Sequence, residues 1–143
     1  MIRELLPPET GRAYEAMLEL RPRLGSRDAF VEQVDERQRP AGYRLVAVVD
    51  GVDGPVAAVG GFRVVDNLAW GRHLYVDDLS TVPRARRRGH AGALLEWLLD
   101  EARRQGCGQI HLDSGVGADR EAAHRLYFAS GFRISSHHFS RDL

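Results

Sequence analysis

Three consecutive arginines followed by small residues form the segment best suited to hold a phosphate group. The segment Arg86 to Gly92 follows a strand-like run and precedes a helical pattern. The first N–H groups of a helix lack intrahelical acceptors, and small side chains let an anion approach them closely. The sequence therefore predicts a pyrophosphate-binding turn, whose candidate residues are Arg86, Arg87, Arg88, Gly89, His90, Ala91 and Gly92. The alternatives are a solvated cationic loop and a nucleic-acid contact, although the run lacks the interleaved aromatic residues expected for the latter.

Two adjacent aspartates interrupt the apolar run from Leu74 to Val82 and are candidates for acid–base chemistry. Asp77 and Asp78 should face opposite sides of a sheet, so at most one can point directly into a cleft. A carboxylate in a partly buried strand is costly unless it is paired or functional. One of the two is therefore a candidate general base, and the alternative is an ion pair with one of the many arginines.

The composition excludes several classes of protein. The 143 residues carry equal numbers of acidic and basic side chains, which argues against a general nucleic-acid or membrane surface and favours a small-molecule partner. Every basic residue apart from histidine is arginine, so a Schiff-base lysine and a P-loop lysine are both excluded. The single cysteine, Cys107, cannot form an intramolecular disulfide, and no leader or membrane-spanning run is evident. We expect one cytoplasmic domain over residues 1–143.

The hydrophobic pattern predicts a mixed α/β sheet with helices on both faces. The order is β-α-α-β-β-β-α-β-α-β, and the strand–helix–strand unit through Gly89 should be parallel. Two early helices are expected, one entered through Pro7 to Thr10 and one capped by Ser26. The other expected helices are Ala93 to Arg104 and Arg120 to Ser130; the expected strands are Ile2 to Leu6, Tyr43 to Val49, Val56 to Val65, Arg72 to Val82, Gln109 to Leu112 and Phe132 to Phe139.

Two separated signatures make the chain resemble the GNAT superfamily of N-acetyltransferases. They are Arg86-x-x-Gly89-x-Ala91, and Ala123-His124-Arg125-Leu126-Tyr127 followed by Gly131-Phe132. The resemblance implies a mixed, mostly antiparallel sheet, acetyl-CoA as donor with its pyrophosphate on Arg87 to Gly92, and an amine as acceptor. The chain is similar in finer detail to small-molecule acetyltransferases of the aminoalkylphosphonate type, whose ends also read like His137-His138-Phe139.

The resemblance also implies roles for individual residues. Tyr127 would be the general acid, with a packed helix tyrosine as the alternative, and Asp78 is preferred to Asp77 as the base. Backbone groups of the segment Leu79 to Thr81 would hold the pantetheine arm and the thioester carbonyl; its members are Leu79, Ser80 and Thr81. Many members of the family carry asparagine where Arg120 stands, so Arg120 either reaches a coenzyme phosphate or sits at a solvated helix start.

The acceptor site is defined less well by the sequence. We expect it between the first two helices, the segment Asn67 to His73 and the last strand, with His137 or His138 facing it. Asp50, Asp53 and Asp66 would suit a cationic amine. No required metal is expected, because the histidines lack carboxylate or cysteine partners at ligand spacing. A homodimer is plausible, and a non-catalytic module that binds acyl-CoA or a nucleotide is the alternative function.

Overall fold

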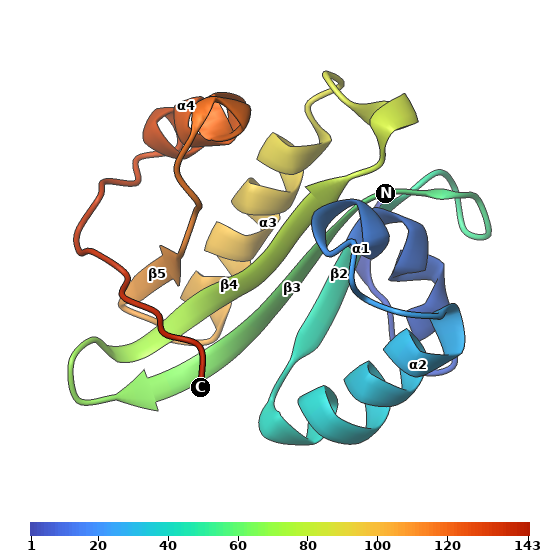
Figure 1. Ribbon diagram of the computed structural model, residues 1–143, viewed down its shortest axis with the longest axis horizontal. Helices are drawn as coiled ribbons and strands as arrows, with labels where there is room; N and C mark the ends of the chain where they lie inside the picture. The colour runs from blue at the N-terminus through green and yellow to red at the C-terminus, as the bar shows by residue number, and fades with distance from the viewer. The chain divides into compact units, whose positions relative to one another are not determined.

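The computed structural model describes residues 1–143 and contains one five-stranded sheet (Figure 1). The strands follow the order β1-β2-β3-β4-β5, and β1 to β4 pair antiparallel with their neighbours. Strands β4 and β5 are parallel and are joined through helix α3. This arrangement confirms the predicted mixed sheet. The strands are β1 (Ile2–Glu4), β2 (Arg44–Val49), β3 (Val56–Asn67), β4 (Gly71–Thr81) and β5 (Gln109–Leu112).

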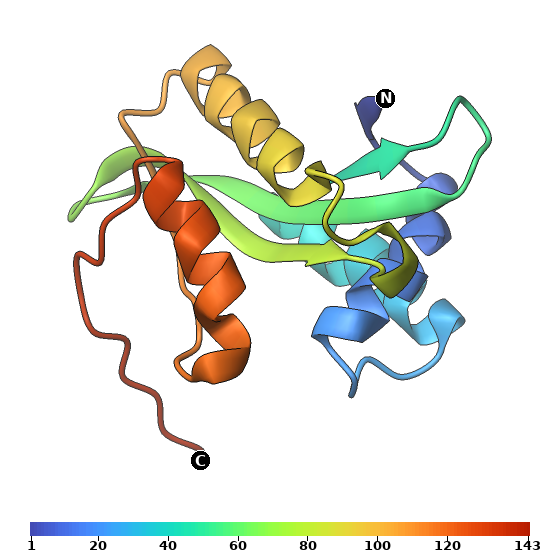
Figure 2. The same ribbon diagram turned by 90° about the horizontal axis from the view of Figure 1, so that it is seen from above.

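Helices cover both faces of the sheet, as expected. Figure 2 shows α3 (His90–Arg104) on one side of the strands and the two early helices, α1 (Tyr14–Leu20) and α2 (Arg27–Glu32), on the other. Ser26 caps α2 by accepting a hydrogen bond from Ala29 N at 3.1 Å, which matches the predicted N-cap. Short helical turns complete the early region: η1 (Glu9–Ala13), the π-helical η2 (Gln33–Gln38) and η3 (Arg39–Ala41).

The core lies between the sheet and these helices. Strand β2 is buried along Leu45 to Val49 on both of its faces, because it is a central strand with helices above and below. On the α3 side, the predicted stripe of Leu94, Leu95 and Leu98 is fully buried. Packing on both faces therefore holds β3 and β4 rigidly, and these two strands carry the residues described below.

The chain divides into two compact units, residues 1–111 and residues 112–143. The second unit contains the turn η5 (Ala118–Arg120) and helix α4 (Glu121–Ala129). The predicted strand Phe132 to Phe139 is wrong, because residues 132–143 form no regular element. In a strand, Phe132 and Ile134 would face one side and Phe139 the other, so the segment has no continuous apolar face. No other strand pairs with it either. No helix is long and apolar enough to cross a membrane.

Candidate active site

The turn before α3 presents free backbone donors. After the 3-10 turn η4 (Pro83–Ala85), the chain reaches Gly89, whose φ of 79° is the left-handed conformation that suits glycine. Helix α3 then starts at His90, three residues earlier than its apolar pattern indicates. The first N–H to find a backbone acceptor is that of Ala93, which donates to Gly89 O at 3.0 Å. The N–H groups from Arg87 to Gly92 precede it without a backbone acceptor, at the positive end of a fifteen-residue helix.

The arginines of this turn differ in their partners. Arg86 pairs with Glu19 of α1 at 3.2 Å, and Arg84 pairs with Glu15 of the same helix. Arg87 and Arg88 are exposed and make no ion pair or hydrogen bond. Arg87 also has a φ of 60°, which is unusual for a residue with a side chain. Two guanidinium groups without partners lie beside free N–H donors, and this combination fits a diphosphate. The turn from Arg87 to Gly92, called the cradle below, therefore suits the coenzyme that the family resemblance implies.

The edge of β4 beyond β5 offers a second set of backbone groups. Just before β5, Gly108 N donates to Arg72 O at 2.9 Å, which places the start of β5 beside the start of β4. Because β5 has only four residues, it lies beside β4 no further than about Asp77, and the rest of this edge of β4 has no neighbouring strand. Val82 N donates to Ala57 O of β3 at 2.9 Å. Because hydrogen-bonded and non-hydrogen-bonded positions alternate, Leu79 and Thr81 turn their N–H and C=O groups away from β3. An extended amide chain could pair there.

A β-bulge separates the two aspartates. Asp78 pairs with Gly61 and Val76 pairs with Phe62, so Asp77 is the extra residue on β4. Asp77 accepts two hydrogen bonds from Arg63, each at 2.8 Å. The alternative considered for this pair, an ion pair with an arginine, thus describes Asp77 well. Asp78 lines a cavity, whereas Asp77 does not.

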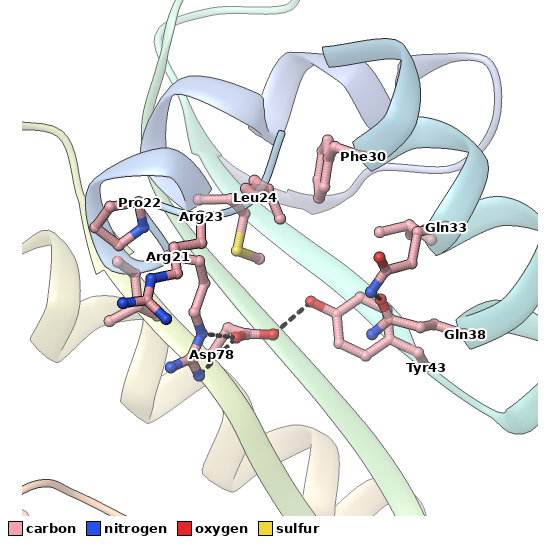
Figure 3. A pocket seen from close by; sticks show the side chains of 12 residues that line it. Arg21, Pro22, Arg23, Leu24, Phe30, Gln33, Gln38, Tyr43 and Asp78 are labelled. Carbon is pink, nitrogen blue, oxygen red and sulfur yellow. Dashed lines mark hydrogen bonds and ion pairs between the residues drawn. The ribbon is translucent and has the colours of Figure 1, made fainter. Parts of the chain in front are cut away.

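The cavity has a volume of about 550 Å³ and is formed entirely within residues 1–111 (Figure 3). Its walls come from α1, α2, η2 and the segment between α1 and α2, with Tyr43 and Asp78 on the sheet side. The two early helices line this cavity, whereas Asn67 to His73 does not, nor do Asp50, Asp53 and Asp66. Its lining residues are Met17, Leu20, Arg21, Pro22, Arg23, Leu24, Phe30, Gln33, Val34, Gln38, Tyr43 and Asp78.

Both oxygens of the Asp78 carboxylate have partners in the cavity. Tyr43 Oη donates to Oδ2 at 2.8 Å, and Arg21 Nε donates to Oδ1 at 3.1 Å (Figure 3). Burial, together with the charge of Asp78, raises the pKa of Tyr43 well above its ordinary value of about 10. The phenol therefore stays protonated and acts as a fixed donor that orients the carboxylate.

Gly61 makes the approach of Tyr43 possible. A Cβ at this position would lie 1.9 Å from Tyr43 Oη and 2.5 Å from its Cζ, closer than any real contact. Neither residue was predicted as part of a site from the sequence, and Arg21 was not predicted either. The available signal was the Gly60-Gly61 pair inside an otherwise apolar strand, which indicates a close approach of another group.

Tyr127 lies on α4 in the second unit. Its ring packs against Phe132 with centroids 6.1 Å apart. Burial raises the pKa of Tyr127, an effect that the nearby Arg120 guanidinium opposes. Arg120 also donates to Ser114 Oγ at 3.3 Å. The phenol therefore stays protonated at neutral pH, which a proton donor requires.

The remaining candidates have mainly local contacts. His124 Nε2 contacts Gly115 O at 2.9 Å, and His138 Nδ1 lies 3.4 Å from Asp113 Oδ1. Cys107 N donates to Ala102 O at the end of α3, and burial raises the pKa of its thiol, which disfavours a nucleophilic thiolate. The structure has no group of three or more histidine, cysteine, aspartate or glutamate residues arranged to hold a metal.

Solved structures share this fold over nearly their whole length. A Trypanosoma brucei acetyltransferase superposes with a TM-score of 0.81 at 22% identity, covering 100% of this chain and 99% of that one. The enzyme AAC(6')-Iy, in complex with a CoA bisubstrate analogue, gives a TM-score of 0.81 at 16% identity, covering 100% and 97% of the two chains. At these identities the likeness establishes the fold, and it confirms the predicted fold class.

Sequence comparison identifies the family. The model of the Acetyltransferase (GNAT) family matches residues 8–132. YhdJ of Bacillus subtilis (strain 168), named an uncharacterized N-acetyltransferase, is 30% identical over 136 residues, which cover 94% of this chain and 92% of that protein. The cradle before α3 and the exposed edge of β4 lie inside the matched region. The chain therefore belongs to the GNAT family of acetyltransferases and is an N-acetyltransferase.

Proposed function

We propose that this N-acetyltransferase transfers the acetyl group of acetyl-CoA directly to a small primary amine held in the cavity of Asp78. The observation that carries the proposal is the position of this carboxylate. Asp78 faces the cavity on one side, and Leu79 follows it at the exposed edge of β4. A bound amine and a thioester paired along that edge would therefore meet at adjacent residues.

The chain supplies separate binding surfaces for the two substrates. We propose that the N–H groups from Arg87 to Gly92, with Arg87 and Arg88, hold the coenzyme diphosphate. Leu79 and Thr81 would pair with the pantetheine amides as an added strand would. The Leu79 N–H would donate to the thioester carbonyl oxygen, where negative charge develops during attack. Such a preorganised donor is worth about a hundredfold or more in rate.

Two side chains would move protons. Asp78 would accept one proton from the ammonium group, so that the neutral nitrogen can attack the thioester carbon. A C–N bond then forms, the C–S bond breaks, and the nitrogen gives up a second proton to solvent. Asp78 would then return to the carboxylate by passing its proton to solvent. Tyr127 would give its phenolic proton to the leaving thiolate and recover one from solvent. The net products are the N-acetylated amine, CoA thiol and one proton.

The volume of the cavity supports a small acceptor. About 550 Å³ lies within the usual range of roughly 300–1,000 Å³ for small-molecule sites. The walls combine apolar side chains, among them Met17, Leu24 and Phe30, with a few polar groups. A small amine with a short apolar body fits that lining.

Release of free thiol from acetyl-CoA in the presence of a panel of amines tests the proposal. We expect thiol release that depends on the amine, and a fall in kcat of about a hundredfold or more in Asp78→Asn and Tyr127→Phe. The matched control is Asp100→Asn, an exposed carboxylate on α3 that pairs only with Arg103. Coenzyme binding without amine-dependent thiol release would instead support a non-catalytic acyl-CoA-binding module.

A further inference from the structure

Three residues lie along one face of α4, and two of them contact the loop after β5. Arg120 is the residue from which α4 starts, and His124 and Tyr127 follow it after four and seven residues. With about 3.6 residues per turn, these spacings place the three side chains on the same side of the helix. Arg120 and His124 both contact Ser114, the second residue after β5. Arg120 therefore joins this loop to the helix that carries the candidate acid.

Ser114 anchors the guanidinium group of Arg120. Arg120 Nη2 donates to Ser114 Oγ at 3.3 Å, and His124 Nε2 lies 3.1 Å from the same oxygen. His124 Nε2 also lies 2.9 Å from Gly115 O, which can only accept, so this nitrogen carries a hydrogen. The hydroxyl of Ser114 thus receives donors from α4, and the guanidinium is fixed beside it.

Arg120 is held more closely than an ordinary surface arginine. It is half-buried, whereas Arg125 on the same helix is exposed and pairs only with Glu121 at 3.8 Å. A guanidinium group has several N–H donors in a planar fork, and Arg120 uses them for both Ser114 and the hydroxyl oxygen of Tyr127. These contacts argue against the solvated helix start that the sequence left open.

The surroundings of Tyr127 make proton donation difficult without help. An ordinary phenol has a pKa of about 10 and an ordinary thiol one of about 8.5, so proton transfer from tyrosine to a thiolate is uphill. Burial raises the pKa of Tyr127 further, and the charge and hydrogen bond of Arg120 lower it. The neighbouring titratable groups have other partners, since His124 contacts the loop backbone and Asp113 lies 3.4 Å from His138 Nδ1. Arg120 is thus the cation that favours the phenolate.

We propose that Arg120 is a positioning residue for the general acid: it fixes the Tyr127 hydroxyl and stabilises the phenolate that is left when the proton passes to the leaving thiolate. The O–H bond of Tyr127 breaks, the S–H bond of CoA forms, and the phenolate then recovers a proton from solvent. This inference rests on the proposed function, in which Tyr127 is the acid. Asparagine, which many family members carry at this position, can hold Ser114 but brings no charge to the phenolate.

The ionisation of Tyr127 can be measured without turnover. NMR of protein labelled at the tyrosine ζ-carbons follows each of the four tyrosines separately, and the signal missing from Tyr127→Phe identifies Tyr127. Because a nearby opposite charge favours the ionised form, Arg120→Gln should raise the midpoint of this titration by about one pH unit or more. Arg125→Gln removes an exposed cation from the same helix, and as the matched control it should leave the midpoint unchanged.

Kinetics of the same variants separate support of the acid from coenzyme binding. Arg120→Gln should lower kcat by about threefold or more, because a weaker acid transfers its proton more slowly, and it should leave KM for acetyl-CoA unchanged. Arg120→Lys keeps the charge, so its titration midpoint and its kcat should lie between those of the wild type and Arg120→Gln. Thermal unfolding of each variant shows that it is folded.

The outcomes separate this inference from the proposed function. If Tyr127→Phe keeps the wild-type kcat, Tyr127 is not the acid, and the inference fails with that part of the proposed function. If Tyr127→Phe loses activity while Arg120→Gln leaves the titration of Tyr127 unchanged, the inference alone is overturned. It is also overturned if Arg120→Gln raises KM for acetyl-CoA at an unchanged kcat, since Arg120 would then bind a coenzyme phosphate. Equal effects of Arg120→Gln and Arg120→Lys would overturn it as well, because the charge would then have no role.

Discussion

The hydrogen bond from Tyr43 to Asp78 gives the sharpest single-atom perturbation of the site. Tyr43→Phe removes only the hydroxyl, from a side chain that is 4% exposed, and it leaves Asp78 Oδ2 without its donor at 2.8 Å. A hydrogen bond to a charged group contributes about 1.5–3 kcal/mol. We therefore expect the free energy of unfolding to fall by about that amount at neutral pH, and Tm to fall by about 4–10 °C.

The pH dependence of this loss has a definite sign. The pKa of Tyr43 is raised in the folded protein, because burial and Asp78 disfavour the phenolate. A raised pKa contributes stability that is fully present below the unfolded value, about 10, and that is lost as pH rises further. The stability gap between wild type and Tyr43→Phe should therefore narrow above about pH 10.

Urea unfolding followed across this pH range measures both effects. Tyr14→Phe is the matched control, because Tyr14 Oη donates to a neutral acceptor, Gly25 O, in an exposed setting. It should cost about 0.5–1.5 kcal/mol with no comparable link to Asp78. Equal losses in the two variants, or a gap that widens at high pH, would refute the reasoning.

Three further predictions concern Gly61, Arg88 and the pair of Arg44 with Glu101. Gly61→Ala should destabilise the fold and lower kcat more than Gly60→Ala, whose new Cβ would meet Val46 Cγ1 at 3.2 Å instead of Tyr43 Oη at 1.9 Å; comparable unfolding and kinetics in the two variants would contradict this. Arg88→Gln should raise KM for acetyl-CoA without changing KM for the amine, with Arg103→Gln as control, and an unchanged coenzyme KM would remove Arg88 from the cradle. Burial raises the pKa of Glu101, but hydrogen bonds from Arg44, Gln105 and Arg104 lower it by more, so this stabilisation is present above about pH 4.5 and is lost as pH falls. The free energy of unfolding should therefore fall less between neutral and acid pH in Glu101→Gln than in the wild type, and identical acid profiles would be the contrary result.

The turn before α3, which we propose to bind the coenzyme, could be located from the sequence because its signals are local. Small residues at Gly89, Ala91 and Gly92 and the apolar stripe of the following helix lie within one continuous segment. Helix α3 begins at His90 and not at Ala93 as predicted, because the half-buried residues His90, Ala91 and Gly92 carry no apolar stripe that would mark a helix start. Local patterns therefore locate the helix better than they locate its first residue.

The cavity that we propose as the acceptor site depends on contacts that sequence patterns do not encode. The bulge at Asp77 changes the register of β4 against β3, and the alternation of side chains alone gives no sign of it. Tyr43 contacts Gly61 and Asp78 only because β2, β3 and β4 pair side by side. Arg21, which follows α1, reaches Asp78 from a distant part of the sequence. The predicted last strand is wrong because residues 132–139 have a strand-like composition but no partner strand beside them. Local composition cannot show whether a partner strand exists.

Binding of the coenzyme diphosphate by the free N–H groups between Arg87 and Gly92 is the central claim. A crystal structure of the protein with acetyl-CoA tests it most directly. We expect diphosphate oxygens within hydrogen-bond distance of these N–H groups and the thioester carbonyl beside Leu79 N. Coenzyme density elsewhere on the protein, with this turn left free, would contradict it.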